Sequence, residues 1–324
     1  MSEDGGLICA YYIDEGGTSK LINWADLKQG VRTTGWTWVH LDRNGDGARD
    51  WLQNNADLEE NTVEALLAEE SRPRCIVRKT GTLLILRGVN LNPHANPEDM
   101  ISVRVWIENN RIITVRRRKL MAMDQIRQNF NEGTGPISPG EFVLSLTSGL
   151  VERMEGVMDT FEGEIDELET EQLTGSVSEL RNNLVTVRQR MIPLRRYLAP
   201  QRDALAHLLV AKTEWMDDWH RSRLYDVADQ VTRFVEDLDS ARERTSVIQD
   251  SMTNRIAERM NQIMMLLSIV AAVFLPLGFV TGLLGINVGG IPGAENSSAF
   301  GIVTGLLITV ALLELAIFKW LKWI

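Results

Sequence analysis

The chain has 324 residues, of which 44% are hydrophobic and 24% are charged, and it carries a formal net charge of −10 at pH 7. An acidic balance excludes a nucleic-acid-binding protein built on a basic surface, because binding to phosphates needs clustered Lys and Arg. The apolar residues are unevenly placed, since residues 260–294 and 296–313 contain no charged side chain. About 20 apolar residues are enough to cross a bilayer core, so the sequence also excludes a purely soluble protein.

Residues 1–140 are predicted to form a cytoplasmic α/β domain. No basic segment followed by an apolar stretch opens the chain, so no secretory signal is expected. Short β-rich runs alternate with helical ones. Apolar residues alternate along residues 101–107, Asn109-Asn110 follows, and residues 112–115 are largely apolar, which predicts a hairpin with one face on a core.

One helix of this domain has a recognisable start. Asp57 and Glu60 are three residues apart, which resembles a capping box and predicts a helix over residues 58–70. Pro73 marks its far limit, because proline disfavours helix in the residue before it.

Residues 141–200 are predicted to form an acidic helical hairpin. Residues 141–175 contain ten acidic side chains and one basic side chain, Arg153, which leaves a net charge of −9. An ordinary solvated helix face is the favoured interpretation. The alternative is an electrostatic collector for cations, which requires several copies of the helix around one axis so that their fields add.

Residues 201–262 are predicted to form a long stalk helix that runs into the first span. No proline occurs between Pro200 and Pro276, and the composition between them favours helix. Such a helix would be on the order of 110 Å long, which no small domain can cover, so we expect a bundle made by several subunits. The residues that repeat along it at spacings of three and four, all apolar except Thr245, are Leu224, Val227, Val231, Phe234, Leu238, Ala241, Thr245 and Ile248.

Metal sites on the stalk have weaker support. Glu214, Asp217 and His220 are spaced three apart, so on one helix they could share an ion. A polar helix face is the favoured interpretation, since helices routinely expose such residues. Asp226 and Asp250 would form acidic rings in a symmetric oligomer if they face its axis, which their spacing does not determine.

Two membrane spans are expected over residues 263–284 and 300–318. The joining loop, residues 285–299, contains no Lys or Arg, whereas basic residues precede the first span and residues 319–324 form a basic tail. By the positive-inside rule, both termini face the cytoplasm. Glu314 is the only ionisable residue inside either span, and snorkelling or pairing near Lys319 is favoured over a role in transport.

Two spans per chain cannot enclose a pore, so transport would require an oligomer around a symmetry axis. One stripe of the first span, at spacings of three or four, is expected to line that pore. The alternative is a seam between helices, which Gly278-x-x-x-Gly282 supports, and both can hold in a ring. The stripe consists of Asn261, Met264, Leu267, Ala271, Leu275, Gly278 and Thr281.

The outer end of the first span carries Gly285-Ile286-Asn287. This tripeptide, placed between a long helix and a second span, resembles the Gly-x-Asn signature of the CorA superfamily of divalent cation transporters. The run over residues 275–293 looks very like the zinc-transporting ZntB branch, because Leu284 stands where the magnesium branch usually has Tyr before Gly-Met-Asn. The resemblance covers the whole chain in its order of domains.

The resemblance implies an α+β membrane protein of the bacterial inner membrane, assembled as a funnel-shaped homopentamer. The stalk helix and the first span would line the ion path, with Gly285, Ile286 and Asn287 as the selectivity segment at its mouth. It implies no enzymatic activity, no cofactor, and a transported ion among Zn²⁺, Mg²⁺, Co²⁺ and Ni²⁺. Zn²⁺ is favoured by the likeness to the ZntB branch alone, because neither span contains the Cys or His ligands that Zn²⁺ prefers.

Alternatives stay open. A CorA-type Mg²⁺ channel is the alternative within the same class, and proton linkage and the direction of transport are unresolved. A membrane-anchored metal sensor that conducts nothing is the alternative from another class, and it predicts that Asn287→Ala leaves function intact. An enzyme has little support, since the sequence has no phosphate-binding Gly loop and no His-Glu-x-x-His motif.

Overall fold

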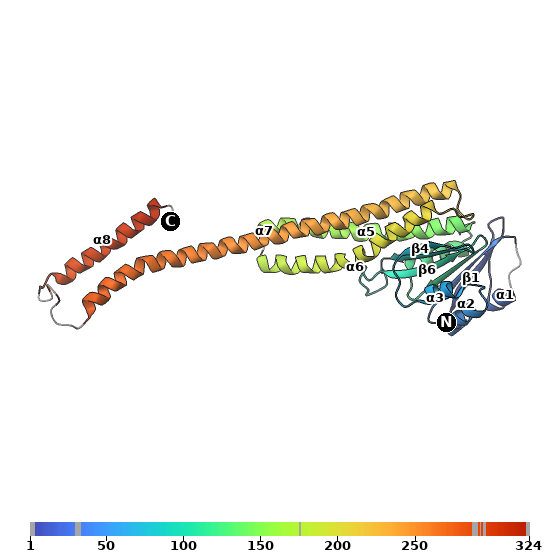
Figure 1. The fold of residues 1–324 in the computed structure, drawn as a ribbon, viewed down its shortest axis with the longest axis horizontal. Coiled ribbons are helices and arrows are strands. Elements are labelled where there is room, and N and C mark those ends of the chain that lie inside the picture. The colour runs from blue at the N-terminus through green and yellow to red at the C-terminus, as the bar shows by residue number, and fades with distance from the viewer. Residues whose placement is uncertain are drawn as a thin grey trace. The chain divides into compact units, whose positions relative to one another are not determined.

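The computed structural model of the protein describes residues 4–29, 34–174, 176–286, 291, 293 and 296–321. The chain divides into two compact units, Met1–Ile248 and Gln249–Ile324. The first unit holds a β-sheet with its covering helices, and the second holds two apolar helical segments (Figure 1). The predicted order of an α/β domain, long helices and two C-terminal apolar helices is confirmed.

A seven-stranded mixed sheet forms the centre of the first unit. All neighbouring strands are antiparallel except β3 and β7, which are parallel. In spatial order the strands are β2 (Ser19–Leu21), β1 (Leu7–Ile13), β3 (Trp36–Asp42), β7 (Arg111–Arg116), β6 (Ile101–Ile107), β5 (Thr82–Gly88) and β4 (Arg74–Val77).

The helices fall before, between and after these strands. In chain order they are η1 (Asp4–Gly6), α1 (Trp24–Gln29), α2 (Asp46–Asn54), α3 (Glu60–Leu67), α4 (Met121–Asn131), α5 (Pro139–Thr174), α6 (Val177–Val210), α7 (Asp218–Gly285) and α8 (Ala299–Trp320). Helix α7 crosses the boundary between the two units, so its residues up to Ile248 belong to the first unit and those from Gln249 to the second.

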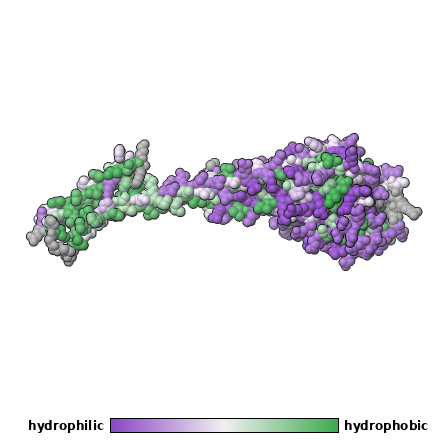
Figure 2. Space-filling model, viewed as in Figure 1, coloured by the Kyte–Doolittle hydropathy of each residue, from purple (hydrophilic) through white to green (hydrophobic). Residues whose placement is uncertain are grey.

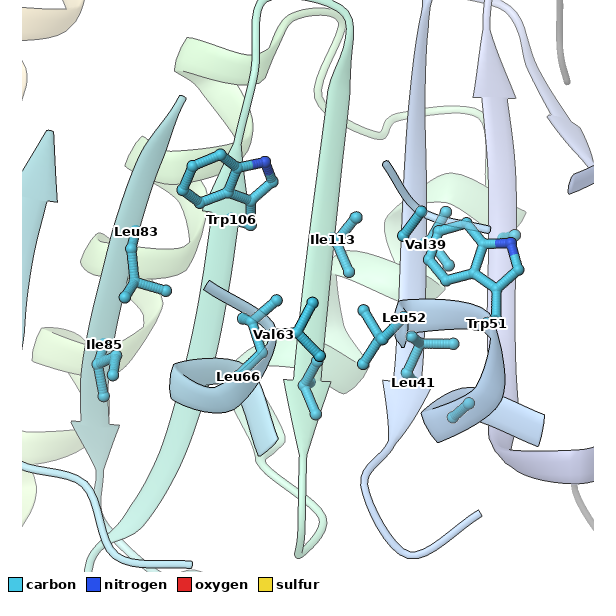
Figure 3. Close-up of a cluster of buried hydrophobic side chains, with 14 of the residues drawn as sticks. Val39, Leu41, Trp51, Leu52, Val63, Leu66, Leu83, Ile85, Trp106 and Ile113 are labelled. Carbon is cyan, nitrogen blue, oxygen red and sulfur yellow. The ribbon is translucent and has the colours of Figure 1, made fainter. Parts of the chain in front are cut away.

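One face of the sheet is covered by α2 and α3 (Figure 3). Trp51 and Leu52 of α2 and Val63 and Leu66 of α3 enter this core and are at most 7% exposed. Burial of large apolar side chains is the main source of stability in such a layer. The strand residues of this core are Ala10, Val39, Leu41, Leu83, Ile85, Trp106, Ile113 and Val115.

The opposite face is buried under α4 and α5. The ring of Trp38 lies 5.4 Å from that of Phe130 in α4 and 5.1 Å from that of Phe142 in α5, between centroids. His40 Nδ1 and Trp38 Nε1 each lie 2.8 Å from the Thr114 hydroxyl oxygen, which donates to a main-chain carbonyl. The Thr114 hydroxyl therefore links the indole N–H of Trp38 to the ring of His40. Burial lowers the pKa of His40 to about 3.

The predicted β6–β7 hairpin is confirmed, with Ile107 opposite Ile112. Both of its faces are buried, rather than the one expected, because the sheet has helices on both sides. Arg104 and Trp106, which alternate with the expected core residues of β6, are each 1% exposed.

The predicted capping box at Asp57 is wrong. Helix α3 begins at Glu60, its N-cap is Glu59, and no side chain caps it. Asp57 has a φ of 51°, a left-handed conformation that Asp tolerates better than most residues, so it belongs to the turn before the helix.

The stalk does not start after Pro200. Pro193 and Pro200 both lie inside α6, which continues to Val210. Each proline removes a helical hydrogen bond, but Leu194 and Leu198 beside them are at most 1% exposed, so packing holds the helix together. Residues 211–217 are not helical, and the stalk helix α7 begins at Asp218.

Helices α5 and α6 of the same chain cover the apolar stripe of α7 in the first unit, and the three helices run side by side (Figure 1). Phe161 of α5 and Phe234 of α7 line one shared groove, and Leu238 is 1% exposed. Arg195 of α6 forms an ion pair with Asp239 of α7. The expectation that other subunits are needed to bury this stripe is therefore wrong, because the hairpin folds back along its own stalk.

Candidate functional site: a membrane-spanning helix pair

Two helices of the described chain are long and apolar enough to cross a membrane: the C-terminal part of α7, and α8. Hydrophobic residues dominate the surface of both segments, whereas the surface of the first unit is mostly hydrophilic (Figure 2). Neither apolar window is buried inside the chain, which is the state expected of a segment whose solvent is lipid or another subunit.

All seven stripe residues from Asn261 to Thr281 lie on α7, which continues through Pro276 without a break. Every one of them is exposed, with Leu267 at 63% and Leu275 at 73%. The structure therefore brings the stripe together on one helix, while its role as a pore lining stays a prediction.

The polar groups of this span are neutral and bonded to their own helix. Thr281 Oγ1 donates to the carbonyl oxygens of Leu277 and Gly278 at 2.9 and 3.1 Å, and Ser268 Oγ donates to the Met264 carbonyl at 2.8 Å. A hydroxyl that donates inward still offers its oxygen as an acceptor. The segment therefore presents weak acceptors and no charge.

The two glycines of the Gly278-x-x-x-Gly282 motif face open space. A Cβ atom added at either position would meet no heavy atom within 4 Å outside its own helical turn. Small residues at this spacing let a second helix approach closely. No segment of the described chain uses that space, so it is available to another subunit.

The predicted selectivity segment lies where the first span ends. Gly285 is the last residue of α7, and Ile286 follows as a bend with 51% of its surface exposed. Asn287 lies outside the described residues. The end of the helix at Gly285 fits the expectation that the backbone leaves the helix there.

Two of the predicted metal ligands on the stalk form a helix cap instead. Asp217 Oδ1 accepts from the backbone N–H of His220 at 2.9 Å, as an N-cap residue does at the start of α7, and the His220 ring Nδ1 lies 2.7 Å from the same oxygen. The backbone N–H of His220 contributes most to holding the pKa of Asp217 below its ordinary value. This pair was missed as a cap because the break before α7 was not predicted.

The remaining predicted metal ligands do not cluster. Glu214 lies in the non-helical segment and accepts from the side chain of Asn109, so it does not share a helix face with His220. Asp226 and Asp250 are both exposed. Within the described ranges, no group of three His, Cys, Asp or Glu side chains is arranged to hold a metal ion.

Glu314 lies on α8. The predicted pairing with Lys319 is not formed, because no ion pair joins these two residues in the part of α8 that the structure describes. The Oε2 atom of Glu314 is buried and has no hydrogen-bond partner among the described residues. A carboxyl group that is buried without a partner inside a candidate membrane span is costly in free energy.

Sequence reasoning also missed a group of buried arginines at one end of the sheet, around Arg43 and Arg104. Arg104 alternates with the apolar residues of β6, so a hairpin with one face on a core gives no reason to expect it buried. The helix predicted over residues 58–70 was the signal that could have revealed this burial, because a helix packed there would cover the face of the sheet that carries Arg104.

Known proteins share this architecture over nearly the whole chain. Residues 33–320 match the family described as CorA-like Mg²⁺ transporter protein. The chain is 39% identical to the divalent cation transporter CmaX of Pseudomonas aeruginosa, over 89% of this chain and 87% of that one. It is 36% identical to the zinc transport protein ZntB of Pectobacterium atrosepticum, over 99% and 96% of the two chains. A structure of full-length CmaX superposes with a TM-score of 0.82 at 36% identity and covers 98% of both chains.

These matches confirm the family predicted from Gly285-Ile286-Asn287, and they extend from the α/β domain through both spans. The chain belongs to the family of CorA-like Mg²⁺ transporter proteins.

Proposed function

We propose that this protein transports divalent metal cations across the bacterial inner membrane through a homopentameric pore, with Zn²⁺ as the favoured ion. The observation that carries the proposal is the uncharged, exposed stripe of α7 from Asn261 to Thr281, in a member of a transporter family. In the sequence, Gly285-Ile286-Asn287 follows this stripe. Membership of that family favours transport over catalysis.

The chemistry of the path suits a hydrated ion. From residue 260 to residue 286 the chain has no acidic, basic, His or Cys side chain, so no group on this segment can replace the water shell by tight coordination. A ring of Asn287 carbonyl oxygens is neutral and would hold a hydrated divalent ion through its waters without trapping it by charge.

The uncovered surface of the span supports an oligomer. Exposed residues outside the stripe, such as Leu266 and Phe279, need lipid or protein around them, and Gly278 and Gly282 leave room for a neighbouring helix. A cyclic arrangement with α7 inside and α8 outside would satisfy both requirements. The excess of Lys and Arg outside the joining loop favours cytoplasmic termini.

The stalk would contribute electrostatics rather than ligands. Asp250 is exposed shortly before the span, and five copies around an axis would raise the local concentration of cations through their summed field. Asp226 is also exposed on α7, and five copies of it would likewise raise the local concentration of cations around that part of the stalk. Neither residue has the neighbours that a metal ligand set would need.

Mg²⁺ transport is the second candidate. The family description names Mg²⁺, and a neutral path that handles aquo ions does not itself separate Zn²⁺ from Mg²⁺. The zinc preference is supported by the relative named as a zinc transport protein, which aligns with 99% of this chain.

The proposal is tested by flux into proteoliposomes that contain the purified full chain. Uptake of Zn²⁺, Mg²⁺ and Co²⁺ is followed with ion-selective dyes, with and without an imposed pH gradient, against protein-free liposomes. The proposal expects Zn²⁺ uptake to be fastest, and acceleration by the pH gradient would establish proton linkage. Faster Mg²⁺ uptake would support the second candidate, and absence of flux for every ion would favour a sensor. Native mass spectrometry of the same preparation should give five copies.

A further inference from the structure

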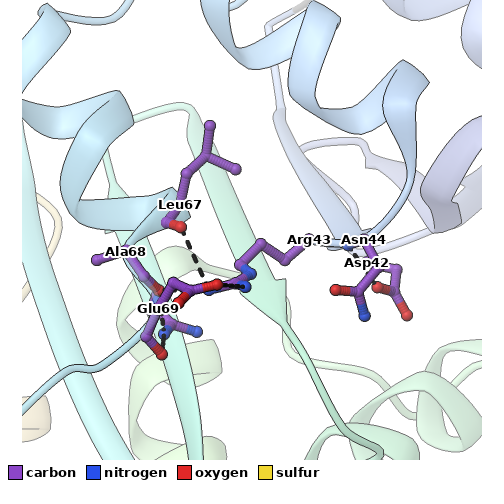
Figure 4. Close-up of polar contacts among 7 residues, drawn as sticks. Asp42, Arg43, Asn44, Leu67, Ala68 and Glu69 are labelled. Carbon is purple, nitrogen blue, oxygen red and sulfur yellow. Dashed lines mark hydrogen bonds and ion pairs between the residues drawn. The ribbon is translucent and has the colours of Figure 1, made fainter.

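Three arginines of the first unit bind the chain segment that follows α3. Arg43 Nη1 donates to the carbonyl oxygen of Ala68 at 2.8 Å, and Arg104 Nη2 donates to the same oxygen at 2.7 Å (Figure 4 shows the contacts of Arg43). Arg87 Nη2 donates to the Ser71 carbonyl at 2.9 Å. Two guanidinium groups therefore share one acceptor at the C-terminal end of a helix, where carbonyl groups attract cations.

Several N–H groups of Arg43 and Arg104 have no hydrogen-bond partner in the part of the chain that the structure describes. Arg104 is 1% exposed, and its Nε and Nη1 atoms are buried without any hydrogen-bond partner among the described residues. Arg43 is 5% exposed, and its Nε atom is in the same state. The Ser71 hydroxyl, on the bound segment, is buried and unpartnered as well. Buried polar groups nearly always have partners, and charged donors are the most costly to leave without one.

The charges at this end of the sheet are also unbalanced. The acid in contact with Arg43 is Glu69, at 3.3 Å, and its side chain is 86% exposed, so water screens much of its field. The pKa of Arg104 is lowered to about 10, first by burial and then by the positive charges of Arg43, Arg87, Arg117 and Arg74. The charged groups that perturb the pKa of Arg104 are all cations, and Arg104 forms no ion pair among the described residues.

We propose that Arg43 and Arg104 form a binding site for a phosphate-class oxyanion, with the Ser71 hydroxyl as a further donor. Two guanidinium groups that share the Ala68 carbonyl carry the unpartnered N–H donors, which suit the oxygens of such an anion. The double negative charge of the anion would offset the two buried guanidinium charges. Water alone could satisfy the donors but would leave the charge of Arg104 uncompensated and that of Arg43 paired with the exposed Glu69 alone. Arg74 and Arg117, exposed at the same end of the sheet, would attract the anion to the site.

The test is equilibrium dialysis of the full chain in detergent against radiolabelled inorganic phosphate, at constant ionic strength set with chloride. The site predicts saturable binding of one phosphate per chain. Arg104→Gln should weaken that binding at least tenfold, while Arg49→Gln, which removes an exposed arginine of α2, should leave it unchanged. Arg43→Gln serves as a second variant if Arg104→Gln does not fold.

A thermal unfolding measurement gives an independent readout. Phosphate should raise the unfolding midpoint of the wild type more than chloride of equal ionic strength, and it should lose this advantage in Arg43→Gln. Absence of saturable binding to the wild type would overturn the site. Equal weakening by Arg49→Gln would also overturn it, since that result would indicate a general charge effect.

Discussion

Arg244 Nε lies 2.6 Å from Glu169 Oε1, which ties α7 to α5 within the first unit. Arg244 also pairs with Asp166, one turn earlier on α5. The hydrogen bond from Arg244 to Glu169 is the main reason that the pKa of Glu169 lies below its ordinary value of 4.5. The acidic hairpin is therefore fastened to the stalk by charge as well as by its apolar face.

Glu169→Gln should lower the stability of the first unit modestly. The Glu169 side chain is 44% exposed, so screening by water limits the effect to about 1 kcal/mol or less. A lowered carboxyl pKa stabilises the fold above the ordinary glutamate pKa, and this contribution is lost as the pH falls through the lowered pKa. Urea unfolding of the full chain at pH 7 and in the acid range should show the two proteins converging at low pH. Glu167→Gln, an exposed neighbour on α5, should leave stability unchanged at either pH.

His40→Gln should remove a pH dependence of stability at mildly acidic pH. His40 is neutral in the fold, with a pKa of about 3, and has an ordinary pKa of 6.5 when unfolded. Between these values the unfolded chain binds one more proton, so the wild type loses about 1.4 kcal/mol of unfolding free energy per pH unit as the pH falls below 6.5. Tryptophan fluorescence during unfolding of the full chain measures this slope. An equal slope in both proteins would contradict the assignment of a neutral His40.

Gly278→Leu should disrupt assembly of the protein without unfolding its first unit. A Cβ atom at this position meets no heavy atom of the described chain within 4 Å outside its own helical turn, so a clash is expected from a neighbouring subunit. The matched control is Gly301→Leu on α8, which has the same open surroundings and is expected to face lipid. Size-exclusion chromatography with light scattering should show loss of the oligomer only for Gly278→Leu. Loss of the oligomer in both variants would place α8 in the interface as well, and an intact oligomer in both would contradict the prediction.

Asp217→Ala should lower the thermal unfolding midpoint, because α7 loses its N-cap. Asp217→Asn should retain most of the midpoint, since an asparagine oxygen also caps a helix but is a poorer ligand for Zn²⁺. Zn²⁺ binding measured by calorimetry should be the same in both variants and in the wild type. A loss of bound Zn²⁺ in Asp217→Asn would restore Asp217 as a metal ligand.

The sequence predicts the two long apolar helices well because each depends on local composition. Long uncharged runs and the absence of basic residues between them need no knowledge of packing. The β6–β7 hairpin is equally local, since alternation and a turn specify it.

Features that depend on packing were harder to predict. Pro200 looks like a helix end in the sequence, but α6 continues through it because Leu194 and Leu198 are buried beside it. Arg104 looks solvated until α3 is seen to cover its face of the sheet. The stripe of α7 was assigned to other subunits, because no sequence pattern shows that α5 and α6 fold back along it.

The central claim, transport through a pore with Asn287 at its mouth, is tested most directly by Zn²⁺ uptake into proteoliposomes containing Asn287→Ala. The matched control is Asn296→Ala, an asparagine of the same loop that bonds the backbone N–H of Ser298. The account predicts that Asn287→Ala loses Zn²⁺ uptake or its preference over Mg²⁺, while Asn296→Ala behaves as the wild type. Unchanged, Zn²⁺-selective uptake by Asn287→Ala would contradict it.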